Sequence, residues 1–165
     1  MKRPYTPRNF AKLIKKVRKF IPDIAITTDV LLGFPGEDGK SFKETLKFIE
    51  QIAPSRMHVF SYSKREGTAA AKSKHSADEK KVKERAKFLV NLSNGFSMDF
   101  AHQFIGQKQN AIIESQRDKR TGLLCGYTDR YIRILLDGPD NLKNQLLPVT
   151  IDHLDRYKYF VFAIL

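Results

Sequence analysis

The stretch IAITTDVLLGFPGEDGKS, residues 24–41, decides the fold. Its first nine residues, 24–32, are β-rich and largely apolar on both sides of an extended chain, which is the pattern of a buried parallel strand. The glycine-rich residues 33–39 predict a turn, and a polar segment then opens a helix. A buried strand that passes through a turn into a helix is typical of α/β proteins, so we expect parallel strands joined by helical crossovers.

Helices are predicted on both sides of this strand. Thr6 carries a capping hydroxyl and precedes Pro7, the residue best tolerated at the first helical position, so a helix begins here and ends before Pro22. Ser41 and Glu44 form a capping box for the helix that follows the turn.

A second strand and a third helix complete this pattern. Residues 57–62 predict a strand, and Ser76 with Glu79 predicts a capping box for a helix that Asn94-Gly95 is expected to break. Two parallel strands are too few to close a sheet. The segment is therefore part of a larger α/β sheet or (β/α) barrel, or it pairs with another chain.

The last third of the chain has a different pattern. Short β-like runs alternate with turn signals, which suits a small antiparallel barrel, and barrels of this kind often bind oligonucleotides. We place the boundary near residues 96–104, giving an α/β segment over residues 1–97 and a small antiparallel β-barrel over residues 98–165. The five runs are residues 111–114, 123–127, 131–136, 146–151 and 159–164.

The charge of the chain favours a polyanionic partner. The net charge is +12, the first 20 residues hold 8 basic residues and no acidic one, and residues 64–87 hold 9 basic and 4 acidic residues. Nucleic acid is the first candidate and an anionic membrane the second, although each cluster alone also suits a solvated helical face. The longest apolar run, residues 159–165, is far shorter than the roughly 20 residues of a membrane span. Without a secretory signal, we expect a cytoplasmic protein.

Two kinds of site are excluded by the sequence. Cys125 is the only cysteine, which rules out an internal disulfide and any cysteine-based metal or iron–sulfur site within the chain. The turn at residues 33–41 misses the phosphate-loop spacing, because Phe34 stands where that motif needs glycine. Pro35 offers no N–H, and the acidic residues after Gly36 would repel a polyphosphate.

Four motifs, in this order and spacing, resemble the C-terminal half of the radical SAM methylthiotransferase family. These enzymes add a methylthio group to adenosine 37 of tRNA or to a ribosomal protein. The form of the first strand and of the last hairpin resembles most closely the branch that acts on threonylcarbamoyladenosine. The motifs are MKRPYT at 1–6, TDVLLGFPGE at 28–37, HVFSYSKREGTAA at 58–70 and GYTDRY at 126–131.

The resemblance implies that residues 1–97 are a partial (β/α) barrel, the C-terminal part of the radical SAM core, which holds part of an S-adenosylmethionine site. It also implies that residues 98–165 are an RNA-binding TRAM domain (a small, OB-like β-barrel). Aromatic and basic side chains interleaved on one hairpin suit stacking on unpaired bases while holding phosphates. Each of these residues also has a structural alternative, in the core or on the surface. The implied cofactor-binding residues are Asp29, Gly33, Gly36, Glu37, Val59, Phe60, Ser61 and Arg65, and the implied tRNA-binding residues are Lys108, Arg117, Lys119, Arg120, Tyr127, Arg130, Tyr131 and Arg133.

One departure from the family decides what this chain does alone. The family carries a cysteine triad for the cluster that cleaves S-adenosylmethionine and three more cysteines for an auxiliary cluster, and this sequence has neither set. The expectation is a C-terminal fragment without activity of its own. The alternatives are a non-catalytic RNA-binding protein and a subunit completed in trans by a cluster-bearing half.

Overall fold

The computed structural model describes residues 4–73 and 77–165. The chain divides into two compact units, Met1–Ser93 and Asn94–Leu165, which are described separately. Within the described residues no helix is long and apolar enough to cross a membrane.

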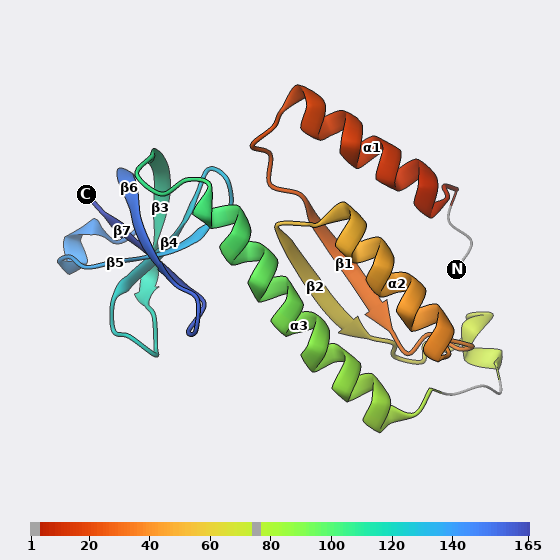
Figure 1. Ribbon diagram of the computed structural model, residues 1–165. Helices are drawn as coiled ribbons and strands as arrows, with labels where there is room; N and C mark the ends of the chain where they lie inside the picture. Colours follow the sequence, from red (N-terminus) through yellow and green to blue (C-terminus); the bar gives the residue numbers. More distant parts are fainter. Residues whose placement is uncertain (1–3, 74–76) are drawn as a thin grey trace. The chain divides into compact units, whose positions relative to one another are not determined.

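Helices and two parallel strands alternate in the first unit, as the sequence predicts (Figure 1). The strands pair in register over their whole length, from Thr27 opposite Arg56 to Leu32 opposite Ser61. The elements are α1 (Pro7–Phe20), β1 (Thr27–Leu32), α2 (Gly39–Ile52), β2 (Arg56–Ser61), a 3-10 turn (Ala70–Lys72) and α3 (Glu79–His102), which continues into the second unit.

The two faces of this sheet differ in exposure. Side chains alternate between the faces along each strand, so residues at the same level of parallel partners share a face. One face carries the buried Val30, Leu32 and Met57. The other carries Asp29 opposite His58, both exposed. The β1–β2 sheet is therefore covered on one face alone.

An arginine joins the first two helices. Arg18 of α1 donates from both terminal nitrogens to the carbonyl oxygens of Ile52 and Ala53, each at 2.6 Å. The last carbonyls of a helix have no partner within it and carry partial negative charge, so a guanidinium there stabilises the end of α2. On the inner side of α1 the ring of Phe10 contacts that of Phe48 in α2, with centroids 6.2 Å apart.

The helix starts are capped differently from the sequence prediction. Thr6 caps α1 as expected, accepting from the backbone of Asn9. The capping box of Ser41 and Glu44 is wrong, because α2 begins earlier and the carboxylate of Asp38 accepts from the N–H and hydroxyl of Ser41 at 2.7 Å. An ionised carboxylate at the helix start also gains from the helix dipole, which favours Asp38 over the serine.

The third helix also differs from its prediction. Ser76 lies outside the described residues, and the carboxylate of Asp78 accepts from the backbone N–H groups of Lys80 and Lys81. The expected break at Asn94-Gly95 is wrong, since α3 continues to His102. One glycine costs a helix only about 1 kcal/mol, and the buried neighbours Met98 and Ala101 outweigh it.

The second unit contains the five predicted short strands. Each strand pairs with two others, so the sheet closes on itself in the order β3-β4-β5-β7-β6 around a continuous apolar core (Figure 1). The expectation of wholly antiparallel pairing is wrong for one pair, because β5 runs parallel to β7. The strands are β3 (Lys108–Arg117), β4 (Leu124–Thr128), β5 (Arg133–Leu136), β6 (Leu146–Asp155) and β7 (Phe160–Ile164), with a 3-10 turn at Asp140–Leu142.

Candidate functional site

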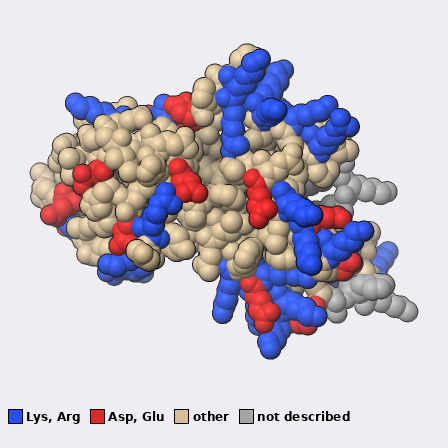
Figure 2. Space-filling model, viewed as in Figure 1, with Lys and Arg blue, Asp and Glu red and all other residues tan. Residues whose placement is uncertain are grey.

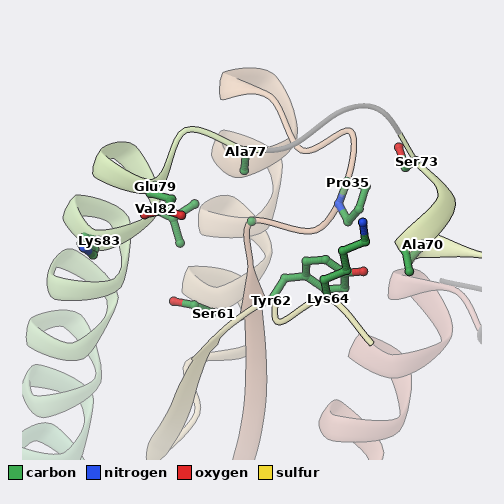
Figure 3. Close-up of a pocket in the computed structure, with 12 residues that line it drawn as sticks. Pro35, Ser61, Tyr62, Lys64, Ala70, Ser73, Ala77, Glu79, Val82 and Lys83 are labelled. Atoms are coloured by element: carbon green, nitrogen blue, oxygen red, sulfur yellow. The ribbon is translucent and has the colours of Figure 1, made fainter. Parts of the chain in front are cut away.

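A pocket of about 450 Å³ opens beside the carboxyl ends of β1 and β2, and we call it the strand-end pocket. Figure 3 shows Tyr62 and Lys64 in the segment that follows β2, Ala77 in the segment before α3 and Val82 in the first turn of α3. Its volume falls within the roughly 300–1,000 Å³ of small-molecule sites, which occur preferentially at this edge of α/β sheets. The lining residues are Gly33, Pro35, Ser61, Tyr62, Lys64, Ala70, Ala71, Ser73, Ala77, Glu79, Val82 and Lys83.

The turn after β1 shapes one wall of this pocket. Gly33 has φ +72°, and a Cβ atom at this position would lie 2.9 Å from Cγ2 of Val82, so only glycine fits without displacement. The N–H of Gly33 donates to Oε2 of Glu37 at 3.1 Å, while Oε1 of Glu37 accepts from Nη1 of Arg85 at 2.6 Å. Both carboxylate oxygens of Glu37 are therefore engaged within the protein.

An unpaired hydroxyl lies in the wall of the strand-end pocket. The hydroxyl of Tyr62 is buried and has no hydrogen-bond partner among the described residues. Its ring is held edge-on against Phe34, with centroids 5.5 Å apart. Buried polar atoms are nearly always paired, so the missing partner makes this hydroxyl a candidate for a hydrogen bond to a ligand. Lys64 and Lys83 add positive charge at the rim, and Glu79 adds a carboxylate.

The structure brings together only some of the cofactor-binding residues predicted from the sequence. Gly33 and Ser61 line the strand-end pocket, and Glu37 holds the turn that forms it. Gly36 and Arg65 are exposed and lie outside the lining. The remaining three belong to the strands: Asp29 and Phe60 lie on the exposed face of the sheet, and Val59 is half-buried on the opposite face.

The sequence prediction missed ten of the twelve residues that line the pocket. Tyr62 and Lys64 directly follow the predicted strand, and this adjacency was the available signal. Glu79, Val82 and Lys83 come from α3, and no local pattern predicts that the start of this helix reaches the turn after β1.

A second pocket, of about 460 Å³, lies on the second unit. It is formed by the end of β3, the turn that follows it and side chains of β4 and β5, and we call it the basic cleft. Four of the eight predicted RNA-binding residues line it: Arg117, Lys119, Arg120 and Arg133. Lys119 and Arg120 are exposed, and the guanidinium of Arg120 lies 4.6 Å from the ring centre of Phe160. The lining residues are Glu114, Ser115, Gln116, Arg117, Asp118, Lys119, Arg120, Cys125 and Arg133.

Two arginines of the basic cleft hold its shape. Arg117 donates to the carboxylate of Asp140 and to the backbone oxygens of Gly122 and Gly138, at 2.8 to 3.0 Å. Arg133 donates to Oδ2 of Asp118 at 2.8 Å. Because these guanidinium groups are occupied within the protein, Lys119 and Arg120 are the better candidates for contact with an external anion.

The carboxylate of Asp118 organises the turn between β3 and β4. Its Oδ1 accepts from the backbone N–H groups of Arg120 and Thr121 and from the Thr121 hydroxyl. The hydrogen bonds from Arg133 and Thr121 stabilise the ionised form and lower the pKa of Asp118 from 3.8 to about 2. Nearby, burial and the hydrogen bond to Glu114 raise the pKa of the Cys125 thiol, which therefore stays protonated at neutral pH.

The predicted aromatic residues form a pair outside the basic cleft. The rings of Tyr127 and Tyr131 stack with centroids 5.1 Å apart and an angle of 28° between them. Tyr131 has φ +60°, a conformation that costs a non-glycine residue free energy and often marks functional sites, and it is 55% exposed. Arg130 is placed against Phe104 and Asp129, and Lys108 is exposed at the start of β3.

Residues 4–73 and 77–165 contain no group of three or more His, Cys, Asp and Glu side chains arranged to hold a metal ion.

No family model matches the chain, but individual proteins do. The threonylcarbamoyladenosine tRNA methylthiotransferase MtaB of Bacillus subtilis is 35% identical over 153 residues, which cover 92% of this chain and 34% of that protein. The tRNA-2-methylthio-N(6)-dimethylallyladenosine synthase of Pelotomaculum thermopropionicum is 31% identical over 151 residues, again 92% of this chain and 34% of that enzyme. The chain spans about a third of the length of these curated relatives. By this similarity, which includes both the strand-end pocket and the basic cleft, the chain belongs to the radical SAM methylthiotransferase family.

Proposed function

We propose that this chain is the C-terminal part of a tRNA methylthiotransferase that acts on threonylcarbamoyladenosine 37. In this role it contributes part of the S-adenosylmethionine pocket and the contact with tRNA. The observation that carries the proposal is the 35% identity with MtaB over 92% of the chain. The assignment of residues 1–97 to the radical SAM core and residues 98–165 to a TRAM domain belongs to the same proposal.

The strand-end pocket and the neighbouring strand ends are the proposed cofactor wall. S-adenosylmethionine supplies, when a reduced cluster cleaves it, the radical that activates an adenosine carbon. In this proposal the hydroxyls of Tyr62 and Ser61 would form hydrogen bonds with its polar groups, and Lys64 would pair with its carboxylate. Asp29 and Phe60, on the exposed sheet face, extend this wall. Gly36, Val59 and Arg65 complete the predicted set as neighbours of the strand ends.

The second unit is the proposed tRNA contact. Stacking of an unpaired base on an aromatic ring contributes about 1–3 kcal/mol, and the exposed Tyr131, backed by Tyr127, presents such a ring. Lys119 and Arg120 at the basic cleft would hold phosphates, together with Lys108. Arg117 and Arg133 support the cleft through their bonds to Asp140 and Asp118.

The iron–sulfur clusters of the family would be held by a portion that this sequence does not include, because Cys125 is its only cysteine. That portion belongs to a longer polypeptide or to a separate subunit. The exposed face of the β1–β2 sheet favours either completion, since it carries Phe60 at 52% exposure and, among the described residues, these strands pair only with each other. A non-catalytic RNA-binding protein is the second candidate, favoured by the basic cleft and the tyrosine pair.

Binding measurements separate these proposals. Equilibrium dialysis with labelled S-adenosylmethionine and filter binding with tRNA are applied to the full chain, to Tyr62→Phe and to the exposed control Tyr157→Phe. We expect salt-dependent tRNA binding by all three and weaker S-adenosylmethionine binding by Tyr62→Phe alone. Binding of tRNA without S-adenosylmethionine would select the RNA-binding alternative, and an iron-containing protein that co-purifies would select completion in trans. A chain that binds neither ligand contradicts the proposal.

A further inference from the structure

Five basic side chains form one row along α1, and we call it the α1 stripe. They recur at intervals that place them on the same side of a helix with 3.6 residues per turn. All five are exposed, and they follow one another over about 16 Å at 1.5 Å per residue. The α1 stripe consists of Arg8, Lys12, Lys15, Lys16 and Lys19.

The α1 stripe is fixed on the solvent side of the first unit. The opposite side of the helix is held by the buried Ile14 and by the ring contact of Phe10 with Phe48. The remaining arginine of the helix, Arg18, lies off the stripe and is bound to the end of α2. The row therefore cannot turn inward without breaking these contacts.

The charge of this row is not balanced by carboxylates. The helix contains no acidic residue, and no ion pair within the described chain includes a member of the α1 stripe. Figure 2 shows basic side chains gathered over α1 without acidic ones among them. Like charges at successive turns destabilise an isolated helix through their repulsion. A bound polyanion would remove this repulsion and stabilise the helix.

The neighbouring helices provide a comparison. In α2 the exposed Lys40, Lys43 and Lys47 alternate with the exposed Glu44 and Glu50. The start of α3 likewise mixes both signs, and there Lys81 pairs with Asp78 at 3.6 Å. A mixed surface is the usual solvated helical face, and the α1 stripe departs from it.

We propose that the α1 stripe binds the phosphate backbone of the RNA substrate, as a second RNA-contacting surface in the first unit. The inference rests on the proposed function, because the RNA is the tRNA that the second unit is proposed to bind. A nucleic-acid duplex carries a charge about every 1.7 Å of its axis, so a row of about 16 Å faces several phosphates at once. An anionic membrane fits less well, since an interfacial helix needs a broad free apolar face. Here Ile14 is buried and Phe10 packs against Phe48, so Leu13 and Phe20 are the large apolar side chains that α1 exposes.

The test compares two triple variants of the full chain with the same change in net charge. Lys12, Lys15 and Lys19 are replaced by Gln in the first, and Lys40, Lys43 and Lys47 in the second. A third variant, with Lys12→Arg, Lys15→Arg and Lys19→Arg, keeps the charge. Dissociation constants for tRNA are measured by filter binding from 50 to 200 mM salt, and binding to vesicles with 30% anionic lipid is measured in parallel. Far-UV circular dichroism checks that each variant is folded.

Each phosphate contact contributes roughly 0.7–0.9 to the slope of log K against log salt, so loss of three contacts lowers the slope by about 2 and weakens binding at least tenfold. We expect this in the α1 glutamine variant alone, with recovery in the arginine variant. Equal small losses in both glutamine variants would overturn the inference and leave the proposed function standing. Loss of vesicle binding with unchanged tRNA binding would also overturn it. Absence of tRNA binding by the unmodified chain would contradict the proposed function itself.

Discussion

Arg85 donates from Nη1 to Oε1 of Glu37 at 2.6 Å, although the two residues lie 48 positions apart. The two side chains are only 17% and 14% exposed, and the guanidinium also lies over the ring of Phe42 at 4.6 Å. This ion pair connects α3 to the turn after β1. Both segments line the strand-end pocket, so the pair holds two of its walls together.

Replacement of Arg85 by Met should destabilise the first unit by about 2 kcal/mol, because Glu37 then remains partly buried without its counter-charge. Urea unfolding followed by far-UV circular dichroism measures the loss. The exposed Lys87, on the same helix, provides the control Lys87→Met, which should change stability by less than about 0.5 kcal/mol. Equal stability of the two variants would show that the ion pair does not hold the turn.

Substitution of Gly126 by Ala should destabilise the closed sheet by about 2 kcal/mol or more, because the added Cβ would collide with the carbonyl oxygen of Ile112. For a unit of this size the midpoint of thermal unfolding falls by about 10 °C. The matched change Gly95→Ala meets no atom within 4 Å inside α3 and should raise stability by about 0.5–1 kcal/mol. A tolerated Gly126→Ala would mean that β3 and β4 separate easily.

Acid should weaken the second unit through Asp118. Its pKa is lowered from 3.8 to about 2 in the folded state, so its stabilising contribution is complete above pH 4 and is lost as the pH falls from about 4 to 2. Asp118→Asn should therefore be less stable than the unmodified chain at pH 7, with the difference shrinking towards pH 2. Thermal unfolding at several pH values measures it, beside the exposed control Asp137→Asn. A difference that does not vary with pH would contradict this role of the carboxylate.

Tyr131→Ala should weaken tRNA binding by about 1–3 kcal/mol, roughly 5- to 150-fold, without changing the salt dependence, because stacking releases no counterions. Tyr131→Phe should bind almost normally, since it keeps the ring. Tyr157, 98% exposed, supplies the control Tyr157→Ala. Filter binding across a salt series distinguishes the cases, and a changed salt slope for Tyr131→Ala would refute a stacking role.

The elements of this protein follow from local patterns, but the composition of its sites does not. Some features are encoded within a few neighbouring residues: the helix cap at Thr6, the glycine-rich turn after β1 and the five short β runs. The structure has a capped helix, a turn and five strands at these places. The choice of Asp38 over Ser41 as the cap depends on where the helix starts, because that start places the Asp38 carboxylate against the N–H of Ser41. The parallel pairing of β5 with β7 depends on how the sheet closes, and no single segment records it.

The same limit applies to the candidate site residues. The resemblance predicts that Glu37 binds the cofactor, but its carboxylate accepts from Arg85, which lies on a helix that local sequence does not place beside the turn. Arg117 and Arg133 are likewise predicted to bind RNA, but their guanidinium groups bind Asp140 and Asp118. Local sequence does not show that these carboxylates lie beside the arginines. A charged residue near a predicted site can be assigned to a ligand only after its partners within the protein are known.

The central claim is that this chain has the same function as the matching C-terminal region of a tRNA methylthiotransferase. The most direct test replaces the matching C-terminal region of Bacillus subtilis MtaB with this chain and measures methylthio-modified threonylcarbamoyladenosine in tRNA by mass spectrometry, in a strain without its own enzyme. The account predicts that the chimera restores the modification, whereas the chain alone and a chimera with Tyr131→Ala and Arg120→Gln do not. A chimera that folds and assembles its clusters but leaves the tRNA unmodified would contradict the claim.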